Sequence, residues 1–182
     1  MRLSRTLPIR LIGAAAALTL VAAACSSDSA SAPPSEAGTP QAQQASGPLA
    51  PASSFETFDG QSVTLTAFQG RPVVLNFWAS WCPSCVAEIS AAFRPVQEDL
   101  GGAITFLGMN IQDERTLALE FLNETGVAWV NAEDSDGTLY SALGGLGMPF
   151  TVVISAEGVV LDSHNGPLDE GHLRSLITET LG

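Results

Sequence analysis

Residues 76–85 read Asn-Phe-Trp-Ala-Ser-Trp-Cys-Pro-Ser-Cys and hold a Cys-x-x-Cys pair directly after apolar and aromatic residues. This stretch continues an apolar run from Val73, which is typical of a β-strand covered on both faces. Beyond Cys85, apolar residues recur at spacings of three and four, the pattern of an amphipathic helix: Val86, Ile89, Phe93, Val96 and Leu100. Pro95 predicts a kink or an end in that helix. A Cys-x-x-Cys pair is therefore expected where a buried strand leads into a helix.

This position has a chemical consequence for the two cysteines. The first N–H groups of a helix carry partial positive charge, which stabilises a thiolate at its start. In such motifs the pKa of the first thiol falls from about 8.5 to roughly 3.5–7.5. Cys82 is therefore predicted to attack a substrate disulfide, and Cys85, on the same side of the helix, to close the Cys82–Cys85 disulfide and release the substrate.

A lone Cys-x-x-Cys also occurs as half of a zinc site. The sequence holds three cysteines and two histidines, with no second Cys-x-x-Cys. These residues do not supply the ligand set of a structural zinc. We expect neither a metal site nor a cofactor.

Strand and helix patterns alternate along the rest of the chain. Asp59-Gly60 separates two short strand patterns and predicts a β-hairpin. The further expected elements are strands at 104–109, 127–130, 150–154 and 159–161, and helices after Asp113, at 138–143 and at 168–181, with Asp113 predicted to cap its helix. This alternation predicts an α/β sheet with helices on both faces.

The first 24 residues are predicted to be a targeting segment. Their basic start and the apolar run at 11–24 match a signal peptide, and the run is short for a permanent membrane span. Residues 21–25, Val-Ala-Ala-Ala-Cys, resemble a bacterial lipobox, so Cys25 is predicted to carry lipid. The alternative is an ordinary secretory signal that ends in an A-x-A cleavage site. Lipidation of Cys25 leaves an even pair of cysteines, Cys82 and Cys85.

Residues 25–52 are predicted to be a flexible tether. They are rich in Ser, Ala, Pro, Gly and Gln and hold a single Leu, too little apolar material to offset the entropy of ordering. A coil of this length reaches about 30 Å. Residues 53–182 are predicted to form the folded domain.

The net charge of the whole chain is −12, and without the first 24 residues four Arg stand against nineteen carboxylates. Phosphate backbones repel such a polyanion, so nucleic-acid binding is not expected.

The stretch at 76–85 resembles the active site of thioredoxin-fold proteins, and the resemblance covers about residues 55–182. It is most similar to the TlpA/ResA/CcmG (DsbE-like) group of membrane-tethered thiol-disulfide oxidoreductases. The resemblance implies a thioredoxin-like fold, with a central mixed sheet flanked by helices, an N-terminal hairpin and a central αβ insertion. Glu88 matches the W-C-x-x-C-x-x-E pattern of that group, which implies proton exchange with Cys85. The alternative is that Glu88 is a solvated helix residue.

Residues 147–151, Gly-Met-Pro-Phe-Thr, resemble the loop that holds the cis-proline of this fold. The resemblance implies that Pro149 lies against the Cys-x-x-Cys and that the loop backbone meets an extended substrate. Met148 stands where the group often has Thr. Trp81 borders the cysteines and is expected to line the substrate surface.

The resemblance implies disulfide exchange outside the cytoplasm, by a chain held on the membrane by its lipid anchor. Expected partners are proteins with thiols or disulfides, such as apocytochrome c, and a membrane redox partner. The motif allows a reductant for cytochrome c maturation or an oxidant that inserts disulfides. An alternative is a copper-binding thioredoxin-fold lipoprotein of the Sco type, with His164 as a ligand. That type has three residues between its cysteines, against two here.

Overall fold

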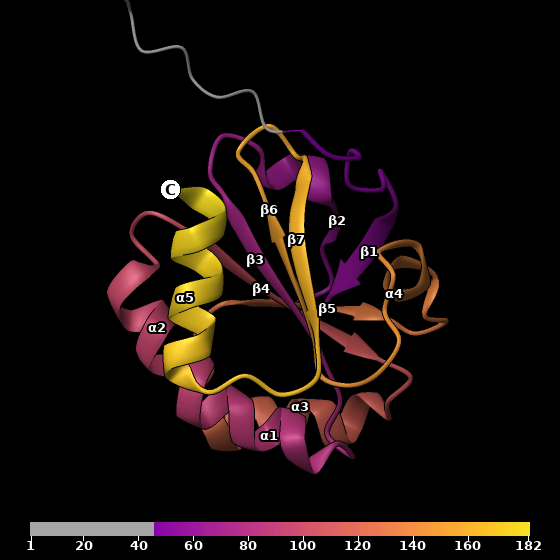
Figure 1. Ribbon diagram of the computed structural model, residues 1–182. Helices are drawn as coiled ribbons and strands as arrows, with labels where there is room; N and C mark the ends of the chain where they lie inside the picture. Colours follow the sequence, from indigo (N-terminus) through magenta and orange to yellow (C-terminus); the bar gives the residue numbers. More distant parts are fainter. Residues whose placement is uncertain (1–45) are drawn as a thin grey trace, which may run out of the picture. The chain divides into compact units, whose positions relative to one another are not determined.

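The fold is described by a computed structural model over residues 46–182 (Figure 1). The predicted signal segment, Cys25 and the tether up to residue 45 lie outside the described residues. Within residues 46–182, no helix is both long enough and apolar enough to cross a membrane.

The core is a seven-stranded mixed sheet in the order β2-β1-β5-β4-β3-β6-β7. The strands are β1 (Ser54–Thr57), β2 (Ser62–Thr64), β3 (Val73–Trp78), β4 (Thr105–Ile111), β5 (Val130–Asp134), β6 (Phe150–Ile154) and β7 (Val160–Asn165). β3 runs parallel to β4 and antiparallel to β6. β1 and β2 form an antiparallel pair, which confirms the predicted hairpin. The strand that leads to the cysteines therefore lies inside the sheet, with a neighbour on each edge.

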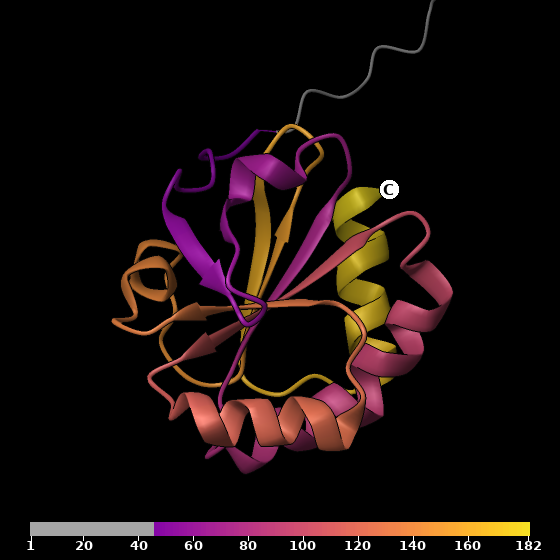
Figure 2. The ribbon, with the colours of Figure 1, turned by 180° about the vertical axis from the view of Figure 1, so that it is seen from behind.

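Helices cover both faces of this sheet. One side is covered by α1 (Pro83–Glu88), α2 (Arg94–Leu100), α3 (Arg115–Thr125) and α5 (Glu170–Leu181). Figure 2, the view from behind the molecule, shows α3. The other side is covered by α4 (Thr138–Ala142) and a short 3-10 helix, η1 (Leu65–Phe68). The predicted class, a mixed α/β sheet flanked by helices, is confirmed.

The alternation of side chains along β3 explains how the strand serves two cores. Its residues at 73, 75 and 77 pack under α4 and η1, whereas Val74 and Trp78 pack under the helices of the other side. Asn76 shares the face of Val74 and Trp78, and its side chain is buried. A polar group is therefore held inside the core on the side of α1.

The helical segment that follows the cysteines continues to Leu100, beyond Pro95. A π-helical turn, η2 (Ile89–Phe93), joins α1 to α2, and Pro95 is the second residue of α2. Proline has no N–H for the helical hydrogen-bond ladder, and the wide turn lies just before it. The predicted irregularity is therefore a π turn within a longer helical segment.

Three local expectations were wrong. The strand predicted at 127–130 begins at Val130, where pairing with β4 starts at Leu107. The last helix begins two residues later than predicted, because Asp169 caps it by accepting the His172 N–H at 2.8 Å. Asp113 does not cap α3, whose N-cap position is Glu114. The Asp113 carboxylate instead binds the turn before Cys82.

Residues 46–52 were expected in the tether, yet part of this segment pairs with the sheet. The Ala50 N–H donates to the Gly158 oxygen at 2.8 Å, and the Val160 N–H donates to the Pro48 oxygen at 2.9 Å. Backbone hydrogen bonds of this kind leave no trace in composition. The contacts of the folded domain therefore begin before residue 53.

Candidate active site

The two cysteines of the motif form a disulfide at the start of α1. Cys82 is the N-cap residue, and its Sγ accepts the Cys85 N–H at 3.2 Å. The two Cα atoms are 5.3 Å apart. Cys82 is 5% exposed and Cys85 is 1% exposed. A substrate sulfur therefore reaches the bond more easily at Cys82 than at Cys85.

Glu88 lies one helical turn after Cys85 and is buried, with 3% of its surface exposed. Its Oε1 accepts the Asn76 Nδ2–H at 3.1 Å, and its Oε2 accepts the Leu168 N–H at 3.0 Å. Burial raises the pKa of Glu88 from 4.5 to about 7, although the hydrogen bonds from Leu168 and Asn76 lower it. The carboxyl group is thus poised between its two protonation states near neutral pH.

Asn76 links this carboxyl group to the centre of the sheet. Its Nδ2 also lies 3.4 Å from the Thr151 Oγ1, and Thr151 is fully buried next to Asn76 in the β3–β6 pairing. Glu88 therefore belongs to a buried polar group that spans α1, β3 and β6. The solvated alternative for Glu88 does not describe this position.

The loop before β6 carries a cis peptide bond between Met148 and Pro149. Met148 packs against the hydrophobic cluster that includes both Cys82 and Cys85. This contact brings the loop against the disulfide, as the resemblance implied. The Asn165 Oδ1 holds the loop by accepting two backbone N–H groups, from residues 146 and 147, at 2.8 and 3.2 Å.

Two tryptophans near the cysteines have different surroundings. Trp78 is fully buried and donates its indole N–H to the Asn131 Oδ1 at 3.0 Å. Trp81 precedes Cys82 and is 56% exposed, although its indole N–H donates to the Gln112 oxygen at 3.0 Å. An exposed aromatic ring, held in place by its indole hydrogen bond, therefore lies next to Cys82 in the chain.

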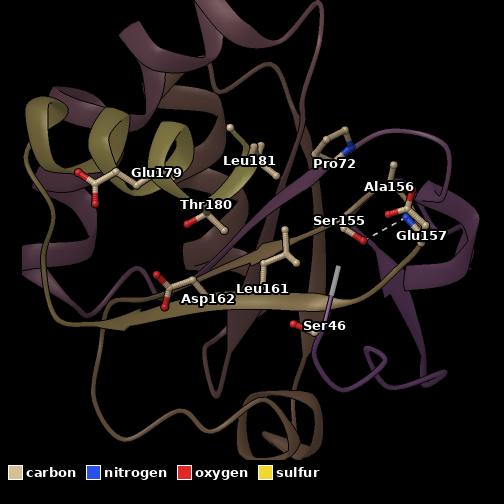
Figure 3. Close-up of a pocket in the computed structure, with 11 residues that line it drawn as sticks. Ser46, Pro72, Ser155, Ala156, Glu157, Leu161, Asp162, Glu179, Thr180 and Leu181 are labelled. Atoms are coloured by element: carbon tan, nitrogen blue, oxygen red, sulfur yellow. Dashed lines mark hydrogen bonds between the residues drawn. The ribbon is translucent and has the colours of Figure 1, made fainter. Parts of the chain in front are cut away.

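A cavity of about 860 Å³ lies at the other end of the sheet (Figure 3). Its lining includes Ser46, Pro72 and Ser155, and no cysteine or histidine of the described chain. Pro72 directly precedes β3, whereas the disulfide follows β3, so the strand length of about 20 Å separates the two. The reactive groups are therefore gathered away from this cavity.

The two histidines lie on other elements of the fold than the two cysteines. His164 is on β7, paired with Thr151, and His172 on α5 contacts the Asp169 carboxylate at 2.8 Å. Among the described residues, no three Cys, His, Asp or Glu side chains are grouped as metal ligands.

Comparison with known proteins places this geometry in a family. Residues 45–179 match the family described as Redoxin. The chain belongs to the Redoxin family. The chain is also similar to proteins named for thiol-disulfide exchange.

This Redoxin chain is 37% identical to the thiol:disulfide interchange protein DsbE of Escherichia coli K12 over 102 residues. These residues cover 56% of this chain and 53% of that protein. It is 34% identical over 123 residues to DsbE of Pseudomonas fluorescens biotype C, 66% of each chain. A crystal structure of a thiol:disulfide interchange protein of the thioredoxin family from Chlorobium tepidum has a TM-score of 0.66 and 26% identity, with 76% of this chain and 99% of that one covered. The fold is therefore thioredoxin-like.

The fold packs Met148, the residue before Pro149, against the cluster of Cys82 and Cys85, with Trp81 next to Cys82 in the chain and Glu88 one helical turn after Cys85. Sequence reasoning missed the Leu168 N–H as a partner of Glu88, because a backbone group has no residue type to reveal it. It also missed the role of Asp113 at the turn before Cys82. An acidic residue two positions after a buried strand was the available signal.

Proposed function

We propose that this chain is a thiol-disulfide oxidoreductase that exchanges disulfides with substrate proteins through Cys82 and Cys85. The observation that carries the proposal is the disulfide-bonded cysteine pair at the start of a helix, with Met148 packed against the cluster that holds both cysteines. The names of the similar proteins support the same chemistry.

The first step forms a mixed disulfide. When a substrate is reduced, the Cys82 thiolate attacks one sulfur of the substrate disulfide, whose S–S bond breaks and leaves the electron pair on the other sulfur. The Cys85 N–H, which points at the Cys82 Sγ, stabilises negative charge on that sulfur. The same steps in reverse oxidise a substrate dithiol, and the relative redox potentials decide the direction.

The second step releases the substrate. Cys85 loses its proton, its sulfur attacks the Cys82 sulfur, and the substrate thiolate leaves as the Cys82–Cys85 disulfide forms. Cys85 is almost fully buried, so solvent is a poor proton acceptor there. Glu88 is three residues further along the same helical segment and therefore on the same face. Because its pKa is about 7, it accepts this proton in one direction and donates it in the other.

The exchange takes place outside the cytoplasm, where disulfides persist, with the chain held on a membrane by lipid at Cys25. The lipobox-like residues 21–25 support this location. The described chain begins at Ser46, beside the cavity of Figure 3. Ser46 therefore lies at the end of the sheet away from the cysteines, which leaves the cysteine end free for partners. These partners are proteins with thiols or disulfides, apocytochrome c among them, and a membrane redox partner.

The test uses the purified chain and a peptide that holds one disulfide. The reduced wild type is expected to reduce the peptide, Cys82→Ser to be inactive, and Cys85→Ser to accumulate a mixed disulfide. At mildly acidic pH, Cys82 is expected to be the only thiol alkylated rapidly. An inactive wild type would refute the function, and equal labelling of the two thiols would refute the assignment of roles.

A further inference from the structure

The turn between β3 and Cys82 depends on a second segment for its hydrogen bonds. Its own bond is from the Cys82 N–H to the Ala79 oxygen, at 3.1 Å. The Ser80 N–H and the Ser80 hydroxyl both point to Asp113, in the connection between β4 and α3. The residues just before the reactive cysteine are therefore fastened to the neighbouring strand connection.

Asp113 is built into this connection as an acceptor of four hydrogen bonds. Its Oδ2 accepts the Ser80 N–H at 2.6 Å and the Asn110 Nδ2–H at 2.9 Å. Its Oδ1 accepts the Ser80 Oγ–H at 2.7 Å and the Glu114 N–H at 2.8 Å. Each oxygen accepts one backbone N–H, from Ser80 or from Glu114, and a backbone N–H cannot accept, so a carboxylate suits this place better than an amide.

The charge of Asp113 is secured by the same contacts. Burial raises the pKa of Asp113, but the hydrogen bonds from Asn110, Ser80 and Glu114 outweigh it, so the pKa lies below its ordinary value. Asn110 is itself buried at the end of β4, paired with Trp78 at the end of β3. Asp113 thus joins the turn to the ends of two adjacent strands.

Gln112 adds a second connection to the same turn. Its φ is 46°, in the left-handed region that side chains other than glycine seldom adopt. In this conformation its carbonyl oxygen accepts the Trp81 indole N–H. A strained backbone position persists only where its surroundings fix it, and such positions gather at functional sites. The next residue, Asp113, is held in place by four hydrogen bonds.

We infer that Asp113 is a positioning residue for disulfide exchange, which acts through Ser80 and Gln112 to fix the turn that carries Trp81 and Cys82. Its contacts are with the turn, with Asn110 of β4 and with its own connection, and it acts on the reacting sulfur through the turn. This inference rests on the proposed function, since it assigns a role within that exchange. It extends the site to a connection more than thirty residues along the chain.

The experiment compares Asp113→Asn with Glu114→Gln, the adjacent exposed carboxylate, which makes the same change in net charge. In either orientation, asparagine at 113 turns an NH₂ group toward one backbone N–H, of Ser80 or of Glu114, so one of these hydrogen bonds is lost and the turn loosens. We expect exchange with the peptide disulfide to slow about tenfold in Asp113→Asn, the size of one charge-assisted hydrogen bond, and to stay within about twofold of wild type in Glu114→Gln.

Two further readouts separate positioning from charge. If Asp113→Asn acted only by removing a nearby negative charge, the pKa of the Cys82 thiol would fall. If the substitution instead displaces the Cys82 thiol from the start of the helix, that pKa rises. We therefore expect the pH profile of Cys82 alkylation to move to higher pH in Asp113→Asn. The Trp81 indole N–H resonance in a ¹⁵N-correlated NMR spectrum should shift as well. A profile that moves to lower pH, or an exchange rate equal to that of Glu114→Gln, would overturn the inference.

A second variant covers the case in which Asp113→Asn does not fold. Ser80→Ala removes the hydroxyl bond and leaves the Ser80 N–H bond, so exchange should slow about threefold with a shifted Trp81 indole resonance. Unchanged exchange and an unchanged resonance in Ser80→Ala would overturn the inference. A wild type without exchange activity would instead refute the proposed function.

Discussion

Replacement of Glu88 by Gln gives the sharpest test of the buried carboxyl group. The substitution keeps the shape and removes the titration. The glutamine side chain would still accept the Leu168 N–H through its oxygen, and rotation of the Asn76 amide would let the Asn76 oxygen accept from the new NH₂ group. These bonds change the stability of Glu88→Gln by an amount that does not depend on pH. The pH dependence of the stability difference from wild type therefore reports the ionisation of Glu88.

The pKa of Glu88 sets the expected size of the effect. It rises from 4.5 to about 7 on folding, and one pKa unit corresponds to about 1.36 kcal/mol. The native state therefore binds more protons than the unfolded state between these two values, and its stability falls as the pH rises through this window. Above the window, the buried carboxylate costs about 3 kcal/mol.

The assay is urea unfolding of the oxidised protein at a series of pH values. The free energy of unfolding of Glu88→Gln, relative to wild type, should increase by about 3 kcal/mol between pH 4.5 and pH 8. Glu98→Gln, on the exposed part of α2, serves as the control and should show no such trend. A difference between Glu88→Gln and wild type that stays constant with pH would refute the reasoning.

Stopped-flow exchange with a small disulfide tests the same residue in catalysis. From pH 5 to pH 9, the wild type should resolve the mixed disulfide faster as Glu88 ionises, with a midpoint near 7. Glu88→Gln should lose this inflection and resolve the mixed disulfide at least about tenfold more slowly, while attack by Cys82 changes less. Superimposable pH profiles would mean that Glu88 takes no part in proton transfer.

Three further perturbations test other parts of the chain. Cys25→Ser should move the protein from the membrane fraction to the soluble fraction with its activity in vitro intact, and a soluble wild type would contradict lipidation. Asn165→Ala should release the loop before Pro149 and slow exchange with a protein substrate severalfold. The free energy of unfolding should fall by about 1 kcal/mol. Equal rates for this variant and wild type would show that the loop needs no such anchor. Leu75→Ala, at a fully buried position of β3, should lower the free energy of unfolding by about 2–5 kcal/mol in urea titration, and a loss below about 1 kcal/mol would argue against the burial of Leu75.

Hydrophobic periodicity was sufficient to predict the α/β class and most of its elements. The uninterrupted apolar run of β3 and the helical spacing after Cys85 are local signals, because each reflects the burial of its own segment. Boundaries were less predictable. β5 begins where pairing with β4 begins, and residues 48–50 join the sheet by backbone hydrogen bonds, which do not depend on side-chain type.

The reactive pair could also be predicted, because a Cys-x-x-Cys at a strand–helix junction specifies its chemistry within four residues. The signal segment and the lipid on Cys25 stay predictions from sequence alone. The same applies to the catalytic roles of Glu88, Pro149 and Trp81, whose positions are now defined.

The surroundings of these residues were decided by tertiary structure. The sequence places Glu88 near Cys85, but its burial depends on Asn76 and on the Leu168 N–H, eighty residues further along the chain. Asp113 looked like a helix cap, and only the pairing of β3 with β4 brings it to Ser80. A side chain's pKa and its hydrogen-bond partners depend on groups that long-range packing brings together, and local sequence patterns do not encode that packing.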